Sequence, residues 1–154
     1  MDFTRKNYSS AAPLEASIGY SRMVRVGPFI KIGGTTSVLP DGSVYGEDAY
    51  TQTKYILEKF LRLLAEAGAG AKDVIAVKVY AVDMKLSGEI ARAYSEFFVE
   101  SGPAGFTNVI NTGLRPGVAH SSDKDVKPLF TVVGTTALNR PAQLVEIEAE
   151  AVMT

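Results

Sequence analysis

Apolar and acidic residues alternate along a strand that we expect at 144–152. The acidic positions are Glu146, Glu148 and Glu150, and the apolar positions between them are Val145, Ile147, Ala149 and Ala151. Successive side chains of a strand point to opposite faces, so the three carboxylates form a row with a spacing of about 7 Å. The apolar face has to cover a core. The acidic face has to meet water or a group that balances its charge, and we expect function there.

The size and composition of the chain indicate a single folded domain. Its 154 residues are enough for one real core, and 46% hydrophobic with 21% charged residues is typical of a globular protein. A net charge of -1 gives no overall field that attracts nucleic acid or an anionic membrane. The chain has no cysteine, which excludes disulfides and thiolate catalysis. Because no stretch is typical of a signal or a membrane span, we expect a cytoplasmic protein.

Hydrophobic periodicity and turn residues predict seven elements after an irregular lead-in at 1–19. We expect strands at 20–26, 29–36, 74–82, 130–137 and 144–152, and helices at 48–67 and 87–99. This β-β-α-β-α-β-β order argues for an α+β domain whose helices pack on one face of a single mixed sheet. Residues 101–127 show no periodicity, so we expect a long inserted loop within one domain at 1–154.

Two helices can cover only one face of the predicted sheet. The other face carries Val, Thr and Tyr residues beside the glutamates, a mixture too apolar to be only a wetted surface. Faces of this kind commonly close against further copies of the same chain. We therefore expect a homo-oligomer in which any cleft lies between subunits.

Five groups of residues, taken in order, resemble the YjgF/RidA family, which is also called endoribonuclease L-PSP or translation inhibitor. They include Gly-Gly-Thr at 33–35, Asp-Ala-Tyr-Thr-Gln-Thr at 48–53, Val-Asp-Met at 82–84, Tyr-Ser-Glu-Phe-Phe at 94–98 and Val-Glu-Ile-Glu at 145–148. The resemblance runs from residue 19 to the end, except for the insertion. It implies a chorismate-mutase-like fold and a homotrimer with ligand clefts between its subunits. It also implies hydrolysis of reactive enamines and imines such as 2-aminoacrylate.

The same resemblance implies roles for individual residues. Glu146, the first glutamate of the Val-Glu-Ile-Glu motif, corresponds to the catalytic carboxylate that positions water or moves protons. Tyr20 corresponds to a tyrosine of the pocket. Gly33 stands where the family has a serine, so that hydroxyl is missing here.

The carboxylate-binding arginine of the active deaminases is absent from this sequence. In the family it follows a Pro-Ala pair, whereas here Pro128 is followed by Leu, Phe130 and Thr131. A different alignment, through Pro103, places Gly105 at that position. We expect Phe130 to form an apolar wall beside Thr131 in the pocket, and the substrate to be less charged or bulkier than 2-aminoacrylate.

Arg22 is a candidate replacement cation, because it lies two residues after Tyr20 and so projects from the same strand face. The alternative is an exposed or structural arginine. Glu148 and Glu150 are interpreted as structural, with Arg22, Arg25 or Lys78 available on other strands to pair with them.

The sequence favours neither a metal nor a nucleic-acid site. His120 is the only histidine, it has no nucleophile motif beside it, and it is interpreted as a surface residue. Without a second His or a Cys the usual transition-metal site cannot form, so we expect no metal and no cofactor. Arg115, in the same loop, could reach a neighbouring cleft. The first long helix lacks the basic residues that accompany aromatic RNA-stacking platforms.

Three functional hypotheses follow from these residues. The first is a trimeric small-molecule hydrolase acting on an enamine, an imine or a related reactive metabolite. The second is a trimer whose cleft binds a metabolite without chemistry. The third is an endoribonuclease or translation inhibitor, which the acidic face disfavours.

Overall fold

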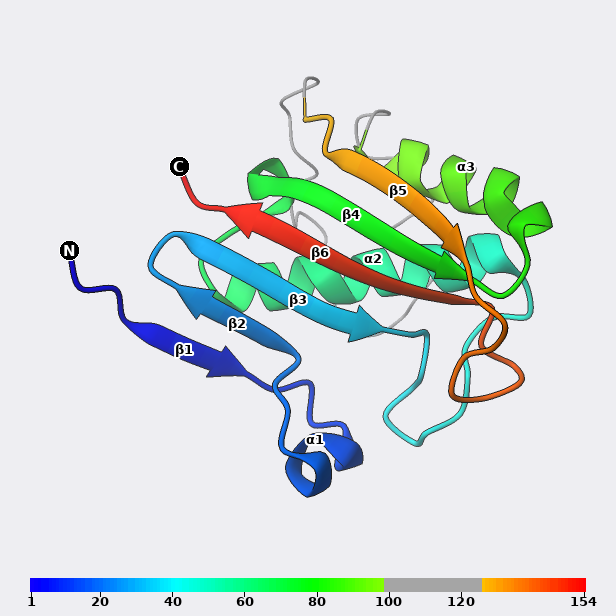
Figure 1. Cartoon of the computed structure of the whole chain (residues 1–154), viewed down its shortest axis with the longest axis horizontal. Helices are drawn as coiled ribbons and strands as arrows, with labels where there is room; N and C mark the ends of the chain where they lie inside the picture. The colour runs from blue at the N-terminus through cyan, green and yellow to red at the C-terminus, as the bar shows by residue number, and fades with distance from the viewer. Residues whose placement is uncertain (99–125) are drawn as a thin grey trace.

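The computed structural model describes residues 1–98 and 126–154 (Figure 1). The expected insertion at 101–127, with Arg115 and His120, lies outside the described residues except for its last two positions. The strands are β1 (Arg5–Tyr8), β2 (Met23–Val26), β3 (Phe29–Thr35), β4 (Val74–Ala81), β5 (Leu129–Gly134) and β6 (Val145–Val152). The α-helices are α1 (Pro13–Ile18), α2 (Ala49–Glu66) and α3 (Ser87–Phe98), and short 3₁₀ turns, η1 (Ala71–Asp73) and η2 (Met84–Leu86), precede β4 and α3.

The described strands form one mixed sheet in the order β1-β2-β3-β6-β4-β5. The β4–β5 pair is parallel and the other neighbouring pairs are antiparallel. Both α2 and α3 lie on the same face of this sheet (Figure 1). The predicted α+β class with helices on one face is therefore confirmed. The glutamate strand, although last in the chain, is central, because β6 lies between β3 and β4.

The predicted lead-in at 1–19 differs from the structure, since it contains β1 and α1. β1 is a four-residue edge strand paired with β2, and three of its four residues are exposed. α1 has six residues and no side-chain hydrogen bond at its N-cap. Neither element is long enough to show a hydrophobic period, so local patterns missed both. The structure also starts β2 at Met23 rather than at residue 20.

Helix α2 begins and ends where its sequence predicts. The Asp48 carboxylate caps it by accepting the Thr51 N–H at 2.7 Å, and Gly68 follows its end with a left-handed φ of 78°. At the N-terminus of α2, the Glu89 carboxylate of α3 accepts the Ala49 N–H at 3.0 Å. A negative group at a helix N-terminus is favourable, because the free N–H groups there carry partial positive charge. The predicted apolar stripe of α2 is buried throughout, at Ala49, Thr53, Ile56, Leu57, Phe60, Leu63, Leu64 and Ala67.

The alternation predicted along β6 is confirmed by burial. Its four inward residues are at most 3% exposed: Val145, Ile147, Ala149 and Ala151. Glu146 and Glu148 on the other face are half-buried, and Glu150 is exposed. Burying one Val or Ile stabilises a fold by about 1.5–3 kcal/mol, so a one-residue slip of β6 would be strongly unfavourable.

Gln52 of α2 fixes the entry to β6. Its side chain is buried and donates to the Gly46 carbonyl at 3.0 Å and to the Ala142 carbonyl at 2.9 Å. Its side-chain oxygen accepts the Leu144 N–H at 2.9 Å. A buried amide with these partners satisfied holds the chain in one place, two residues before Glu146.

No helix among the described residues has the length and apolarity that crossing a membrane requires.

Candidate functional site

Glu146 projects from the sheet face that the helices leave open. In the β4–β6 ladder its neighbour is Tyr80, and on its other side lies the irregular part of the β3–β6 ladder, between Ile32 and Thr35. Gly34 lies in that irregularity. A Cβ at Gly34 would overlap the Glu146 carboxylate and lie 3.1 Å from its Cδ. The half-buried Glu146 side chain therefore occupies space that only glycine leaves free.

Arg22 reaches the same glycine from the segment before β2. Its Nη1 donates to the Gly34 carbonyl, and its Nη2 donates to the Tyr20 hydroxyl at 3.3 Å. The guanidinium carbon lies 5.4 Å from the centroid of the Tyr20 ring, and the side chain is 13% exposed. The Arg22 carbonyl in turn accepts the Gly33 N–H at 2.8 Å. The structure thus brings together Tyr20, Arg22, Gly33 and Glu146.

The environment of Glu146 shifts the pKa of its carboxyl. Burial raises the pKa of its carboxyl, because removal from water disfavours the charged form. The positive charge of Arg22 opposes that rise, and the negative charge of Glu148 adds to it. A carboxyl whose pKa is raised holds its proton more tightly than an exposed one, which suits a group that has to carry a proton.

The other two glutamates of the row have cations beside them. Lys31 on β3 pairs with Glu150 at 2.8 Å, with both side chains well exposed. Lys78 on β4 lies directly opposite Glu148 in the ladder. Arg25 is engaged elsewhere, since it donates to the Gly27 carbonyl at 2.8 Å and to the Ala67 carbonyl at 2.6 Å. The alternation along β3 would have identified Lys31, which sequence reasoning missed.

Within one protomer, the two β5 residues predicted for the pocket are not beside Glu146. β4 lies between β5 and β6. Phe130 is opposite the buried Val77 and stacks on Tyr94 of α3, with ring centroids 4.1 Å apart and planes 22° apart. Phe130 thus belongs to the helix-covered face. Thr131 lies opposite Lys78, on the open face.

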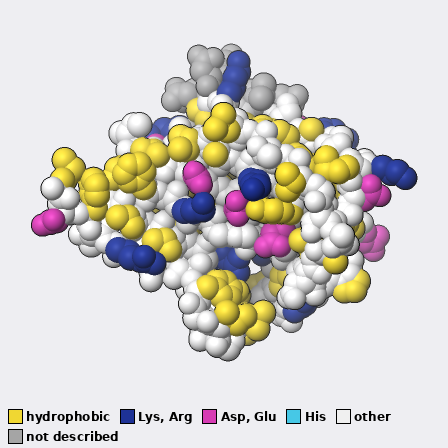
Figure 2. All heavy atoms as spheres, in the orientation of Figure 1, with side chains coloured by type: hydrophobic (Ala, Val, Ile, Leu, Met, Phe, Trp, Pro, Cys, Tyr) yellow, Lys and Arg dark blue, Asp and Glu magenta, His cyan; other side chains and the backbone are white. Residues whose placement is uncertain are grey.

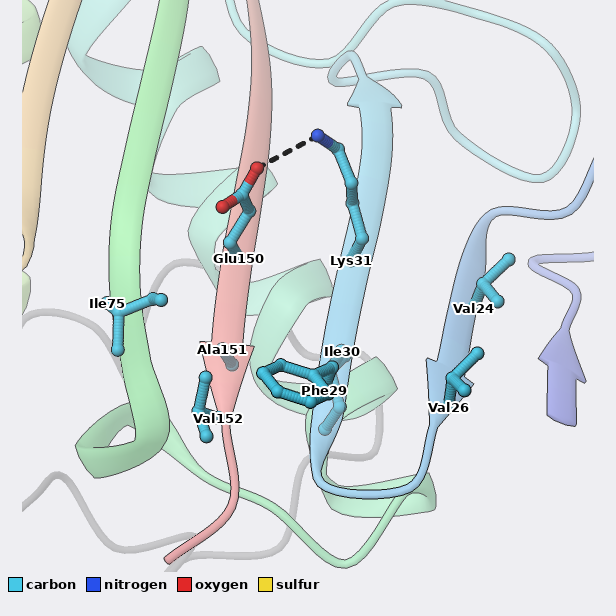
Figure 3. Close-up of a pocket in the computed structure, with 9 residues that line it drawn as sticks. All are labelled: Val24, Val26, Phe29, Ile30, Lys31, Ile75, Glu150, Ala151 and Val152. Atoms are coloured by element: carbon cyan, nitrogen blue, oxygen red, sulfur yellow. Dashed lines mark hydrogen bonds and ion pairs between the residues drawn. The ribbon is translucent and has the colours of Figure 1, made fainter. Parts of the chain in front are cut away.

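The open face also has an apolar hollow at the other end of β6 (Figure 3). Its lining includes Phe29, Ile75 and Val152, and the Lys31–Glu150 ion pair stands beside them. Figure 2 shows the same mixture on the face in view, with charged side chains near the centre and hydrophobic ones around them. The face is amphipathic, as the sequence predicted.

The described ranges, 1–98 and 126–154, contain no group of three or more His, Cys, Asp or Glu residues placed to hold a metal ion. The chemistry available at the described site is that of a carboxyl, a guanidinium, a phenol and backbone N–H groups.

Solved structures define the class of protein to which this fold corresponds. A YjgF-family protein from Mycobacterium tuberculosis matches 97% of this chain and 100% of its own, with a TM-score of 0.71 and 29% identity. A protein of unknown function from Pseudomonas aeruginosa matches 98% of this chain and 94% of its own, with a TM-score of 0.71 and 24% identity. The fold is that of the YjgF proteins.

Sequence comparison identifies the family. A RutC family protein of Pyrococcus abyssi is 38% identical over 86 residues, which are 55% of this chain and 68% of the relative. The family model described as endoribonuclease L-PSP matches residues 10–153. The chain belongs to this family, as the resemblance to YjgF/RidA implied.

Proposed function

We propose that this protein is a RidA-like small-molecule hydrolase that acts on an enamine, an imine or a related reactive metabolite. The observation that carries the proposal is the position of Glu146. Its carboxylate packs against Gly34, and Arg22 donates a hydrogen bond to the Gly34 carbonyl. Burial raises the pKa of the Glu146 carboxyl. The proposed active form is a homotrimer in which a neighbouring subunit completes the cleft over the open, amphipathic face.

The proposed reaction uses one carboxyl for two proton transfers. Protonated Glu146 gives its proton to the terminal carbon of the enamine, which becomes an iminium ion. The resulting carboxylate then takes a proton from water as the water oxygen attacks the iminium carbon. In the carbinolamine that forms, the hydroxyl proton passes to the amine nitrogen, and breaking the C–N bond then releases ammonia and leaves a ketone or keto acid. Water is the only co-reactant, and the proton first donated by Glu146 is recovered.

Arg22 is the proposed anchor for a substrate carboxylate. Of the five N–H groups of a guanidinium, three have acceptors among the described residues: Ser10, Gly34 and Tyr20. Two remain, which is the number that a bidentate carboxylate uses. The ring of Phe130 lies against Tyr94 on the helix-covered face, so what supports a substrate other than 2-aminoacrylate is the absence of the family arginine, not a pocket wall at position 130.

Turnover of freshly generated imino acids tests the reaction. An amino-acid oxidase produces 2-imino acids of increasing side-chain size in the assay, and their decay to keto acids is followed. We expect faster decay for the larger compounds and little acceleration for iminopropionate. Glu146→Gln should slow turnover by about 100-fold or more. Glu150→Gln, on the same strand and face, is the control and should retain activity. Equal losses in both variants, or no acceleration with any imino acid, would contradict the proposal.

A metabolite-binding trimer without chemistry is the second candidate. It is supported by the absence of the family arginine, whose position Phe130 takes here. In the active deaminases that the chain resembles, this arginine anchors the substrate. Thermal-shift screening of small acids and amines tests it, because a ligand that binds only the folded state raises the melting temperature. Stabilisation without turnover would favour the binding protein. Sedimentation as a lone protomer at micromolar concentration would contradict both candidates.

A further inference from the structure

Glu15 is a buried carboxylate in the short helix α1, and its side chain is only 6% exposed. Its two oxygens accept the hydroxyl groups of Ser9 and Ser10. The Ser10 N–H also donates to it, at 3.0 and 3.1 Å from the two oxygens. A buried carboxylate that accepts these hydrogen bonds from Ser9 and Ser10 is held in a defined position.

Arg22 lies beside the same carboxylate. The Arg22 Nε lies 3.6 Å from Glu15 Oε1 and donates to the Ser10 hydroxyl at 3.4 Å. Burial raises the pKa of Glu15, but hydrogen bonds from Ser10 and Ser9 and the charge of Arg22 outweigh it, so that its pKa lies below the ordinary value. Glu15 is therefore an anion at neutral pH, and it lies next to the Nε of the Arg22 guanidinium.

The turn that presents these groups is strained. Ala11 has a φ of 60°, a conformation that residues with a side chain rarely adopt, and its N–H donates to the Ser9 hydroxyl at 2.9 Å. Strained residues persist where surrounding contacts hold them in place. Here the Ser9 hydroxyl that accepts the Ala11 N–H also donates to the Glu15 carboxylate, which lies beside Arg22.

We propose that Glu15 is a positioning residue that fixes the Arg22 guanidinium so that its two unused N–H groups are presented to a ligand beside Glu146. This inference rests on the proposed function, because that function makes Arg22 the anchor. The Arg22 head group is held at Nε by Ser10 and Glu15, at Nη1 by Gly34 and at Nη2 by Tyr20. A long side chain fixed before binding loses less conformational freedom when the ligand arrives.

The test uses the full chain and follows the Arg22 Nε–H directly by NMR, with the resonance assigned by its loss in Arg22→Lys. We expect Glu15→Gln to accelerate exchange of this proton with water by about tenfold or more. In the unchanged protein the resonance should shift as the pH falls through the pKa of Glu15. Ser17→Ala, a change at an exposed position of α1, should alter neither.

Ligand binding is measured with 2-oxobutanoate, a stable keto acid of the product class. Glu15→Gln should weaken its binding by about fivefold or more, and Ser17→Ala should not. Ser9→Ala keeps the charge of Glu15 and leaves the Ser10 hydroxyl on Arg22, but removes one hydroxyl from Glu15, so it decides the question if Glu15→Gln melts α1. We expect an intermediate effect on both the exchange and the binding.

An unchanged Arg22 resonance in a folded Glu15→Gln protein, or undiminished binding of the keto acid, would overturn the proposal. The exchange measurement needs no ligand. If Arg22 loses protection in Glu15→Gln while the unchanged protein neither binds the keto acid nor hydrolyses an imine, the positioning of Arg22 stands and the proposed function is wrong.

Discussion

The carboxylate of Glu146 lies against the bare Cα of Gly34, and no side chain at position 34 could coexist with it in this conformation. The two residues are 112 positions apart and meet because β6 inserts next to β3. The irregular ladder between Ile32 and Thr35 puts the glycine beneath the carboxylate. A glycine in a strand often marks such a close approach.

Gly34→Ala should therefore displace the carboxylate with little loss of stability, because the clash falls on the end of a flexible side chain. We expect turnover to fall by about 100-fold and the free energy of unfolding to change by less than about 1 kcal/mol. Gly88→Ala, in α3, is the control, since nothing lies within 4 Å of the added Cβ. Kinetics and thermal melts of both variants check this, and equal activity losses would contradict it.

Arg22→Gln should raise the pKa of Glu146 further. Arg22 is the positive charge that holds this pKa down against burial, so its removal leaves burial and the charge of Glu148 unopposed. The ¹³C chemical shift of the Glu146 carboxyl, followed against pH, measures the change. Arg25→Gln is the control, because Arg25 binds the Gly27 and Ala67 carbonyls. A lower or unchanged pKa in Arg22→Gln would refute the assignment.

Glu58 of α2 should make stability fall as the pH rises. It is 2% exposed, and neither carboxylate oxygen has a hydrogen-bond partner among the described residues. Burial raises its pKa to about 7, against the opposing charges of Arg62 and Lys54. Between its unfolded value of 4.5 and about 7, the folded protein binds the extra proton. Raising the pH through this window should therefore lower the free energy of unfolding by about 3 kcal/mol.

Urea denaturation at several pH values tests this prediction. Glu58→Gln cannot ionise, so its stability should lack that loss between pH 4.5 and 7. Glu66→Gln, at an exposed position near the end of the same helix, should follow the unchanged protein. Parallel curves for Glu58→Gln and the unchanged protein would show that Glu58 stays charged when folded.

Gln52→Leu should destabilise the protein by about 2–4 kcal/mol, because it leaves the Leu144 N–H and two carbonyls without their buried partner. For a chain of this size that is a fall in melting temperature of about 10 °C. Calorimetry measures it, with the exposed Glu66→Leu as the control. A melting temperature equal to that of the control would mean that water satisfies these groups.

Local pattern was enough to predict the elements with strong periods. The apolar stripe of α2 and the alternation of β6 each repeat over several turns or residues, so burial of one face follows directly from the sequence. The cap at Asp48 and the glycine after α2 mark the ends of the helix. β1 and α1 carry no such repeat, and β1 exists through pairing with β2.

The sequence by itself determined that one face of the central strand is acidic, that Glu146 stands on it and that Tyr20 and Arg22 lie close together. Only the tertiary structure placed Gly34 beneath Glu146, turned Phe130 towards the helices and set Glu15 behind Arg22. The physical reason is the range of the interactions. Periodicity and capping act within a few residues, whereas strand order, ladder irregularities and buried charge pairs depend on segments that meet only in the folded chain.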